Sequence, residues 1–273
     1  MFSALLDRVR TKAPLIHSIT NYVTVNDCAN ILLAVGASPI MADEPEEAAE
    51  ITAVCGGLNL NIGTLNRQTI PAMRLAGRRA AELGKPIVLD PVGAGASTLR
   101  TATAKSLLEE LPITVVRGNI SEIKALASGS AATQGVDANV ADAVTEENLD
   151  ASAAFVRDFA ARSGVVAAVT GAIDLVSDGK RTFVIRNGSP LMSRVTGTGC
   201  MLSALTAAFV TANPGQPLEA AAAAVCAMGL CGEAGAARMG PRDGNLALRG
   251  YLIDAVYCLT GERLDREARY VLR

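Results

Sequence analysis

Two glycines spaced one residue apart and followed by a cysteine form the stretch of this sequence best suited to chemistry. The run Val195–Cys200 reads VTGTGC, and an apolar stretch from Met201 to Val210 follows it directly. Glycine lets the backbone turn sharply, and the first amides of a helix lack partners and lie at the positive end of its dipole. The stretch therefore predicts an anion site, suited above all to phosphate, at a helix start. A glycine-rich turn into a core helix with a buried cysteine is an equally good interpretation of the spacing alone.

The thiol of Cys200 falls in the first turn of that expected helix. The helix field stabilises a thiolate more than a thiol. We therefore expect the pKa of Cys200 to be lowered, and the sulfur to lie beside the bound anion.

Polar residues follow several apolar runs that are typical of buried strands. Asp90, Arg117 and Thr170 each end or follow one such run, and Glu122 comes shortly after Arg117. In open α/β sheets the ligand site lies at the carboxyl ends of the strands. Carboxylate oxygens suit Mg²⁺, and the planar guanidinium suits phosphate oxygens. With the glycine loop, these residues supply what phosphoryl transfer needs: metal, cation and oriented amides.

Each candidate also has a purely structural interpretation. Asp90 precedes a proline and can cap a turn, Glu122 can serve as a helix-dipole partner, and Arg117 can form a surface ion pair. His17, the only histidine, lies in an apolar run and is interpreted as a structural residue. Three cysteines in apolar helical stretches are interpreted as small core residues: Cys226, Cys231 and Cys258. The joint pattern is therefore more informative than any single residue.

Apolar runs alternate along the chain with helical stretches of ten or more residues, which predicts an α/β fold. We expect three layers, with a mostly parallel central sheet covered by helices on both faces. Asp178-Gly179 between two apolar runs indicates a late antiparallel hairpin at one edge of the sheet. No linker or composition shift divides residues 1–273, so we expect one domain, with Ser128–Val144 as a loop or lid edge.

Composition excludes several classes of partner and site. Net charge is −2 and aromatic residues make up 3%, which argues against nucleic acid or an anionic membrane as partner. Six cysteines without a C-x-x-C pair indicate neither zinc nor disulfides, and they fit a reducing cytoplasm. The apolar run 220–232 is shorter than the ~20 residues of a membrane span and predicts a buried helix. The N-terminus lacks the pattern of a signal peptide.

Nucleotide-binding motifs of two common kinds are absent from the sequence. It has no G-x-x-x-x-G-K-[ST], and no G-x-G-x-x-G follows the first expected strand. Six segments nevertheless resemble the hydroxyethylthiazole kinase family of the ribokinase-like superfamily, and the resemblance covers nearly the whole chain. They are Ile19-Thr20-Asn21, LAVGASPIMA at 33–42, LNIGTL at 60–65, LDPVGA at 89–94, RGNISE at 117–122 and VTGTGC at 195–200. Cysteine at 200, where sugar kinases of the superfamily place aspartate, is typical of that family.

The resemblance implies a ribokinase-like fold and transfer of the ATP γ-phosphate to the primary alcohol of 4-methyl-5-(2-hydroxyethyl)thiazole, with Mg²⁺ as cofactor. It implies that the chain is a homotrimer with sites near subunit boundaries. The residues near the reacting alcohol would be Cys200 as the catalytic residue, with Met41, Gly197 and Asn21 at the substrate. The residues at ATP and Mg²⁺ would be Arg117, Thr170, Asn119 and Gly199 for the nucleotide, and Asp90 and Glu122 for the metal.

Other functions compete with this one. The nearest is another ribokinase-like kinase, acting on hydroxymethylpyrimidine or a small sugar, although Ile40 and Met41 favour a small apolar ring over a sugar. A second is an ATP- or ADP-dependent dehydratase that repairs hydrated nicotinamide cofactors, against which Cys200 counts. A third is a nucleotide sensor without catalysis, which the joint presence of metal, cation and thiol candidates disfavours.

Overall fold

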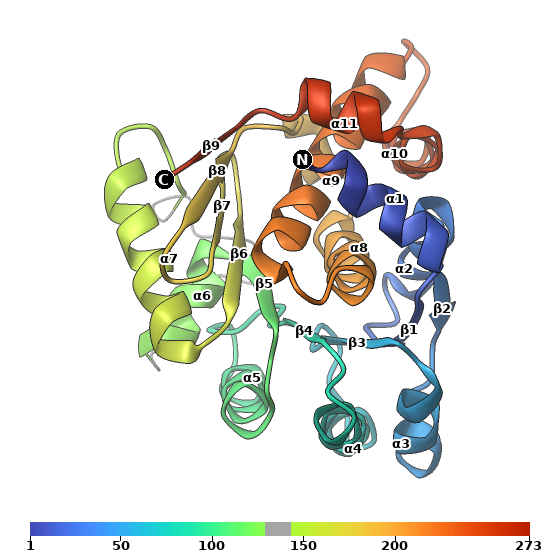
Figure 1. The fold of residues 1–273 in the computed structure, drawn as a ribbon, viewed down its shortest axis with the longest axis vertical. Coiled ribbons are helices and arrows are strands. Elements are labelled where there is room, and N and C mark those ends of the chain that lie inside the picture. Colours follow the sequence, from blue (N-terminus) through green and yellow to red (C-terminus); the bar gives the residue numbers. More distant parts are fainter. Residues whose placement is uncertain (129–142) are drawn as a thin grey trace.

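A central sheet between two layers of helices forms the molecule (Figure 1). This computed structural model describes residues 1–128 and 143–273. The strand order in the described part is β2-β1-β3-β4-β5-β6-β7-β8-β9. The predicted three-layer α/β fold is therefore confirmed. Most of the expected loop Ser128–Val144 lies outside the described residues, so its role as a lid edge stays a prediction.

The parallel part of the sheet places the candidate residues at one edge. It consists of β1 (Leu15–Ile19), β2 (Ser38–Ile40), β3 (Gly57–Asn61), β4 (Ile87–Asp90), β5 (Val115–Asn119) and β6 (Val166–Thr170). The strand register pairs Asn61 with Asp90, and Asn119 with Thr170. The polar residues that end these strands therefore stand next to one another at the carboxyl edge.

The antiparallel end of the sheet contains one strand more than expected. β7 (Asp174–Ser177) and β8 (Thr182–Ile185) form the predicted hairpin, and Asp178 Oδ1 accepts bonds from the amides of Lys180 and Arg181. The hairpin is not at the edge, because β9 (Tyr270–Leu272) pairs with β8 and becomes the outer strand. β9 has three residues, too few to give a recognisable alternation in the sequence.

The helices divide between the two faces of the sheet, as Figure 1 shows. One layer contains α3 (Pro45–Val54), α4 (Thr69–Glu82), α5 (Thr98–Glu110), α6 (Ile120–Ser128) and α7 (Leu149–Ser163). The other contains α1 (Ser3–Lys12), α2 (Val25–Val35), α8 (Thr198–Ala212), α9 (Pro217–Arg238), α10 (Asn245–Cys258) and α11 (Gly261–Glu267). Sequence analysis missed α1 and α11.

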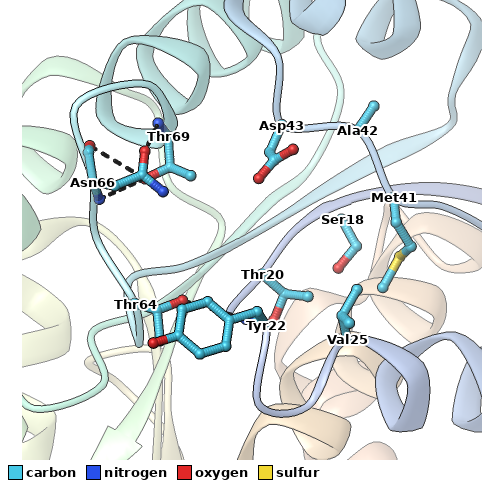
Figure 2. Close-up of a pocket in the computed structure, with 10 residues that line it drawn as sticks. All are labelled: Ser18, Thr20, Tyr22, Val25, Met41, Ala42, Asp43, Thr64, Asn66 and Thr69. Atoms are coloured by element: carbon cyan, nitrogen blue, oxygen red, sulfur yellow. Dashed lines mark hydrogen bonds between the residues drawn. The ribbon is translucent and has the colours of Figure 1, made fainter.

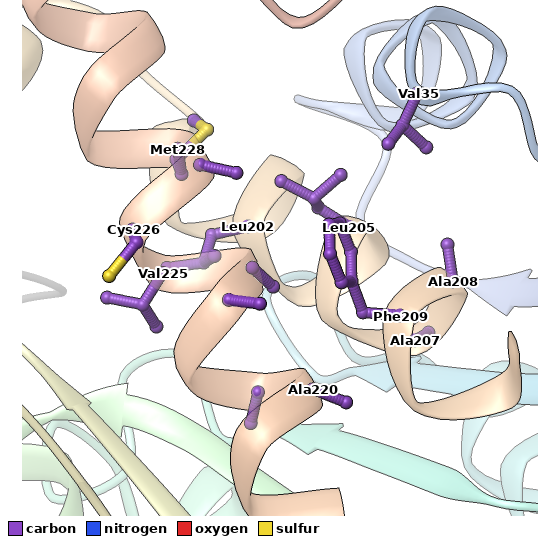
Figure 3. Close-up of a cluster of buried hydrophobic side chains, with 14 of the residues drawn as sticks. Val35, Leu202, Leu205, Ala207, Ala208, Phe209, Ala220, Val225, Cys226 and Met228 are labelled. Carbon is purple, nitrogen blue, oxygen red and sulfur yellow. The ribbon is translucent and has the colours of Figure 1, made fainter. Parts of the chain in front are cut away.

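Two largely buried apolar helices, α8 and α9, form the interior of the second layer (Figure 3). α9 has 22 residues and is long and apolar enough to cross a membrane, but 78% of its most apolar window is buried inside the molecule. The predicted buried helix at 220–232 is therefore confirmed, within a longer element. Cys226 and Cys231 are buried as expected, whereas Cys258 is exposed at the end of α10, so its prediction as a core residue was wrong.

His17 is a structural residue, as predicted. Its ring is fully buried, with Nδ1 2.8 Å from Thr52 Oγ1 and Nε2 2.7 Å from the carbonyl oxygen of Ala42. Burial lowers the pKa of His17, so the ring stays neutral and ties β1 to α3 and to the segment after β2.

Candidate active site

The glycine loop forms the start of α8, as the sequence predicts. α8 begins at Thr198, and Gly197 before it has a φ of 86°, a conformation that favours glycine. A Cβ at Gly197 would also lie 2.4 Å from the Thr24 side chain. The amides of the first helical turn, at Thr198, Gly199 and Cys200, have no acceptor within the helix. The loop thus has the backbone geometry of an anion site.

Arg117 reaches this helix start from the carboxyl end of β5. A Cβ at Gly199 would clash with Arg117 Nη1, so any larger residue there would require the guanidinium to move from its present place. Arg117 Nη2 donates to Thr170 Oγ1 at 2.7 Å, and Nη1 lies 3.4 Å from Asp90 Oδ2. The guanidinium is 11% exposed, and its Nε is buried without a hydrogen-bond partner. The structure therefore brings four candidate residues to one point.

Asp90 is fully buried, and its two oxygens differ in their surroundings. Oδ2 accepts bonds from Ser203 Oγ at 2.6 Å and Asn61 Nδ2 at 2.9 Å, and it faces Arg117. Oδ1 has no hydrogen-bond partner. Burial raises the pKa of Asp90, although the charge of Arg117 opposes the shift. A buried carboxylate oxygen that lacks a hydrogen-bond partner can serve as a ligand for a metal cation.

The charges around Arg117 keep it protonated. Burial works to lower the pKa of Arg117, but the negative charges of Asp90 and Glu122 outweigh it and raise the pKa. A buried pair of this kind costs about 3–5 kcal/mol to break by removing one partner, because the other charge is left uncompensated. Asp90 and Arg117 are therefore best treated as one unit.

Asn119 and Glu122 form a reciprocal cap at the start of α6. Asn119 Oδ1 accepts the Glu122 amide at 2.9 Å, and Glu122 Oε2 accepts the Asn119 amide at 2.8 Å. Glu122 Oε1 accepts the Gly93 amide at 2.8 Å. Burial, and then the charge of Asp90, raise the pKa of Glu122 to about 7. Both oxygens are thus occupied by backbone amides. Within residues 1–128 and 143–273, no three His, Cys, Asp or Glu side chains form a metal cluster.

The expected lowering of the Cys200 pKa was wrong. Burial raises the pKa of this thiol, and the charge of Asp90 adds to the effect, whereas Thr24, Arg117 and Asn21 oppose it. Sulfur Sγ accepts a bond from Asn21 Nδ2 at 3.2 Å. The helix field alone predicts a thiolate, but the low-dielectric surroundings outweigh that field.

A cavity of about 140 Å³ opens where β1, β2 and β3 end (Figure 2). Met41 forms one side, and the ring of Tyr22 lies beside Thr64 on another. The Asp43 carboxylate points into the space between them. The other lining residues are Ser18, Thr20, Val25, Ala42, Asn66 and Thr69. The structure thus places Met41 in a cavity, with Asn21 between that cavity and Cys200.

Comparison with known proteins assigns the family. The family model for the hydroxyethylthiazole kinase family matches residues 6–262. The chain belongs to this family. A hydroxyethylthiazole kinase of Clostridium acetobutylicum is 57% identical over 99% of both chains, and one of Methanoculleus marisnigri is 47% identical over 98% of this chain and 92% of its own.

Solved structures extend the comparison to the fold. The hydroxyethylthiazole kinase protein of Pyrococcus horikoshii has a TM-score of 0.87 at 38% identity, covering 100% of this chain and 98% of its own. A pyridoxal kinase of Staphylococcus aureus in complex with pyridoxal has a TM-score of 0.58 at 16% identity, covering 95% and 98%. The second likeness concerns the fold alone.

Sequence analysis missed four polar residues of this family member's site. Asn61 and Ser203 bond to Asp90, Thr24 bonds to Asn21 Oδ1, and Asp174 accepts the Gly171 amide at 2.8 Å. Only Asn61 had a usable signal, because it lies within LNIGTL at 60–65, one of the segments that carry the family resemblance. Ser203 and Thr24 lie inside or beside apolar helices, where small polar residues are common.

Proposed function

We propose that this chain transfers the γ-phosphate of ATP to the primary alcohol of 4-methyl-5-(2-hydroxyethyl)thiazole. The observation that carries the proposal is the position of Arg117, seated against Gly199 at the start of α8 and beside Asp90 and Thr170. A cation and free backbone amides that converge in this way match the charge that develops on a transferring phosphoryl group.

In the proposed mechanism, Arg117 and the first amides of α8 hold the phosphate oxygens. Thr170 ends β6 and Asn119 ends the neighbouring strand β5, and the rest of the nucleotide would bind along these two strand ends. The alcohol oxygen bonds to the γ-phosphorus while the bond to the ADP oxygen breaks. Because the transition state is loose, alignment and charge neutralisation supply most of the acceleration.

The residues present fit a magnesium ion. Asp90 would hold it through the unpartnered Oδ1, and Glu122 would act on it through water or through Asp90, because amides occupy both Glu122 oxygens. A bound Mg²⁺ would neutralise charge on the phosphate oxygens.

Cys200 would face the hydroxyl that receives the phosphate. Its raised pKa keeps the sulfur a neutral thiol, which can orient the alcohol through a hydrogen bond but cannot accept its proton. That proton would leave late in the reaction, to an oxygen of the transferred phosphoryl group or to solvent. Gly197 and Asn21 flank it on the substrate side. The cavity beside Met41 would take the thiazole ring, because a thioether packs well against a small apolar ring.

The direct experiment is to incubate the protein with ATP, Mg²⁺ and the thiazole alcohol and to measure ADP release. Hydroxymethylpyrimidine, small sugars and hydrated nicotinamide cofactor serve as competing substrates in the same assay. We expect the thiazole alcohol to give the highest kcat/KM. A higher value for any competitor, or ADP release without phosphate on the alcohol, would contradict the proposal. The family assignment gives no support to these alternatives.

A homotrimer in the cytoplasm completes the proposal. Tyr22, which lines the cavity, is 79% exposed, and Val23 next to it between β1 and α2 is 56% exposed, which fits a subunit contact near the site. Sedimentation equilibrium would measure the mass. A monomer at assay concentrations that retains full activity would contradict this part.

A further inference from the structure

Asn61 lies between the two halves of the proposed site and touches both. It ends β3, its side chain is 1% exposed, and the strand register sets it directly beside Asp90. Asn61 Nδ2 donates to Asp90 Oδ2 at 2.9 Å, and Asn61 Oδ1 accepts from Asn21 Nδ2 at 2.9 Å. Asn21 Nδ2 also donates to Cys200 Sγ. One continuous chain of side chains therefore joins the thiol to the Asp90–Arg117 pair.

Backbone amides fix the direction of every bond in this chain. The Gly63 amide can only donate, and it lies 2.9 Å from Asn61 Oδ1, so this oxygen faces Gly63 and Nδ2 must face Asp90. The Thr24 amide donates in the same way to Asn21 Oδ1 at 3.1 Å, so Asn21 Nδ2 must face Asn61 and Cys200. If the side-chain amide of Asn21 or Asn61 were flipped, its NH2 group would face a backbone N–H and its oxygen would lose its donor.

The fixed direction has consequences at each end. At the thiol, an N–H from Asn21 occupies one side of the sulfur and leaves its S–H to point elsewhere. At the carboxylate, Asn61 and Ser203 both occupy Oδ2, which leaves Oδ1 as the open oxygen. Breaking the middle of the chain would remove one hydrogen bond from each end at once.

We propose that Asn61 is a positioning residue for phosphoryl transfer: it aligns the Cys200 thiol, through Asn21, with the open oxygen of Asp90. Because Asn61 is 1% exposed, it would act through its neighbours and not by contact with the substrate. The proposal deepens the proposed function and rests on it.

The first test compares Asn61→Leu with a matched control in the ADP-release assay. Leucine has nearly the same volume but neither donates nor accepts a hydrogen bond. Asn213→Leu is the control, because Asn213 is equally a buried amide with backbone partners, at the far end of α8. We expect Asn61→Leu to lower kcat roughly 10- to 100-fold with little change in KM for the alcohol. We expect Asn213→Leu to lower the melting temperature but to leave kcat within about twofold.

The second test separates alignment from simple loss of packing. In a Cys200→Ala protein one end of the chain is already gone. The kcat penalty of Asn61→Leu should therefore be smaller there than in the wild type, because coupled residues do not act independently. Asn61→Asp keeps the acceptor toward Asn21 and Gly63 but sets a carboxylate oxygen against Asp90 Oδ2, so it should lower kcat at least as much as Asn61→Leu.

Two results would overturn the positioning role. One is an Asn61→Leu protein whose kcat matches that of Asn213→Leu. The other is an equal penalty in the wild-type and Cys200→Ala backgrounds. The wild type measured alongside distinguishes this outcome from failure of the proposed function, since a wild type that releases no ADP with the alcohol contradicts the function itself.

Discussion

The two ends of the proposed site are built in opposite ways. At the start of α8, Asp90 is buried and the Arg117 side chain is only 11% exposed, their partners are fixed, and the glycines lie in close contact with their neighbours. In the cavity beside Met41 the walls come from three strand ends, and Tyr22 and Asp43 are exposed. The first region is preorganised for one group and one charge. The second can change its side chains at small cost, so it is where substrate choice can vary within one fold.

The largest expected effect comes from adding one methyl group to the rigid region. Gly199→Ala would put a Cβ where Arg117 now sits and displace the guanidinium. We expect kcat/KM for ATP to fall on the order of 100-fold or more. Gly250→Ala is the control, because nothing lies within 4 Å of the added Cβ there, and it should keep full activity. A fully active Gly199→Ala protein would show that Arg117 is not fixed by this packing.

A magnesium titration sharpens the description of the rigid region. Asp90→Ala should raise the Mg²⁺ concentration needed for half-maximal rate by roughly 10- to 100-fold, because Oδ1 is the open oxygen. Glu122→Ala should raise it less, since amides hold both of its oxygens. An unchanged titration for Asp90→Ala would remove this residue from the metal site, and a larger shift for Glu122→Ala would reverse the assignment.

Replacing the thiol tests how much the rigid region depends on a base. Cys200→Ala should slow turnover by no more than roughly 100-fold and leave measurable activity, because a base matters little in a loose transition state. Cys200→Asp should work at least comparably to the wild type. Single-turnover kinetics with ATP binding measured in parallel would check both. An alanine variant that binds ATP but has lost all activity would contradict the minor role.

A change in the open region should have a smaller and different effect. Met41→Ala removes part of one wall of the cavity. We expect KM for the thiazole alcohol to rise by about tenfold while kcat and KM for ATP stay nearly constant. An equal loss in kcat would mean that the cavity and the helix start are not separable in the way described.

The smallest expected effect is on stability rather than rate. Burial raises the pKa of Asp174 to about 7, so the folded protein holds this proton more tightly than the unfolded chain. Its contribution to stability is fully present below the ordinary pKa of aspartate and is lost as pH rises toward 7. Asparagine keeps the acceptor for the Gly171 amide. The melting temperature of Asp174→Asn relative to wild type should therefore rise with pH up to about 7 and then level off.

Local signals in the sequence were sufficient for most of the fold. Gly36 ends α2 with a φ of 95°, as glycine after a helical stretch commonly does, and Asp178-Gly179 makes the predicted turn. The strand ends at Asp90 and Thr170 were also correct. These features depend on neighbours within a few residues, where backbone preference and hydrophobic period decide the outcome.

The hydrogen-bond network could not be predicted in the same way. Asn61 and Ser203 reach Asp90 across 29 and 113 residues of sequence, and no local pattern specifies such partners. The Cys200 pKa was mispredicted because the helix start was visible in the sequence but the depth of burial beside Asp90 was not. Electrostatics at a site depends on tertiary packing, which only the structure supplies.

The order of the elements along the chain affects how α9 folds during synthesis of the protein. A segment this apolar would attract the membrane-insertion machinery if it stayed exposed after leaving the ribosome. Of the surfaces against which it packs, α8, β6, β7 and β8 are translated before it, whereas α10 and α11 follow it. When α9 leaves the ribosome, the sheet strands and α8 have already been synthesised. Packing of α9 against them can therefore compete with its insertion into a membrane.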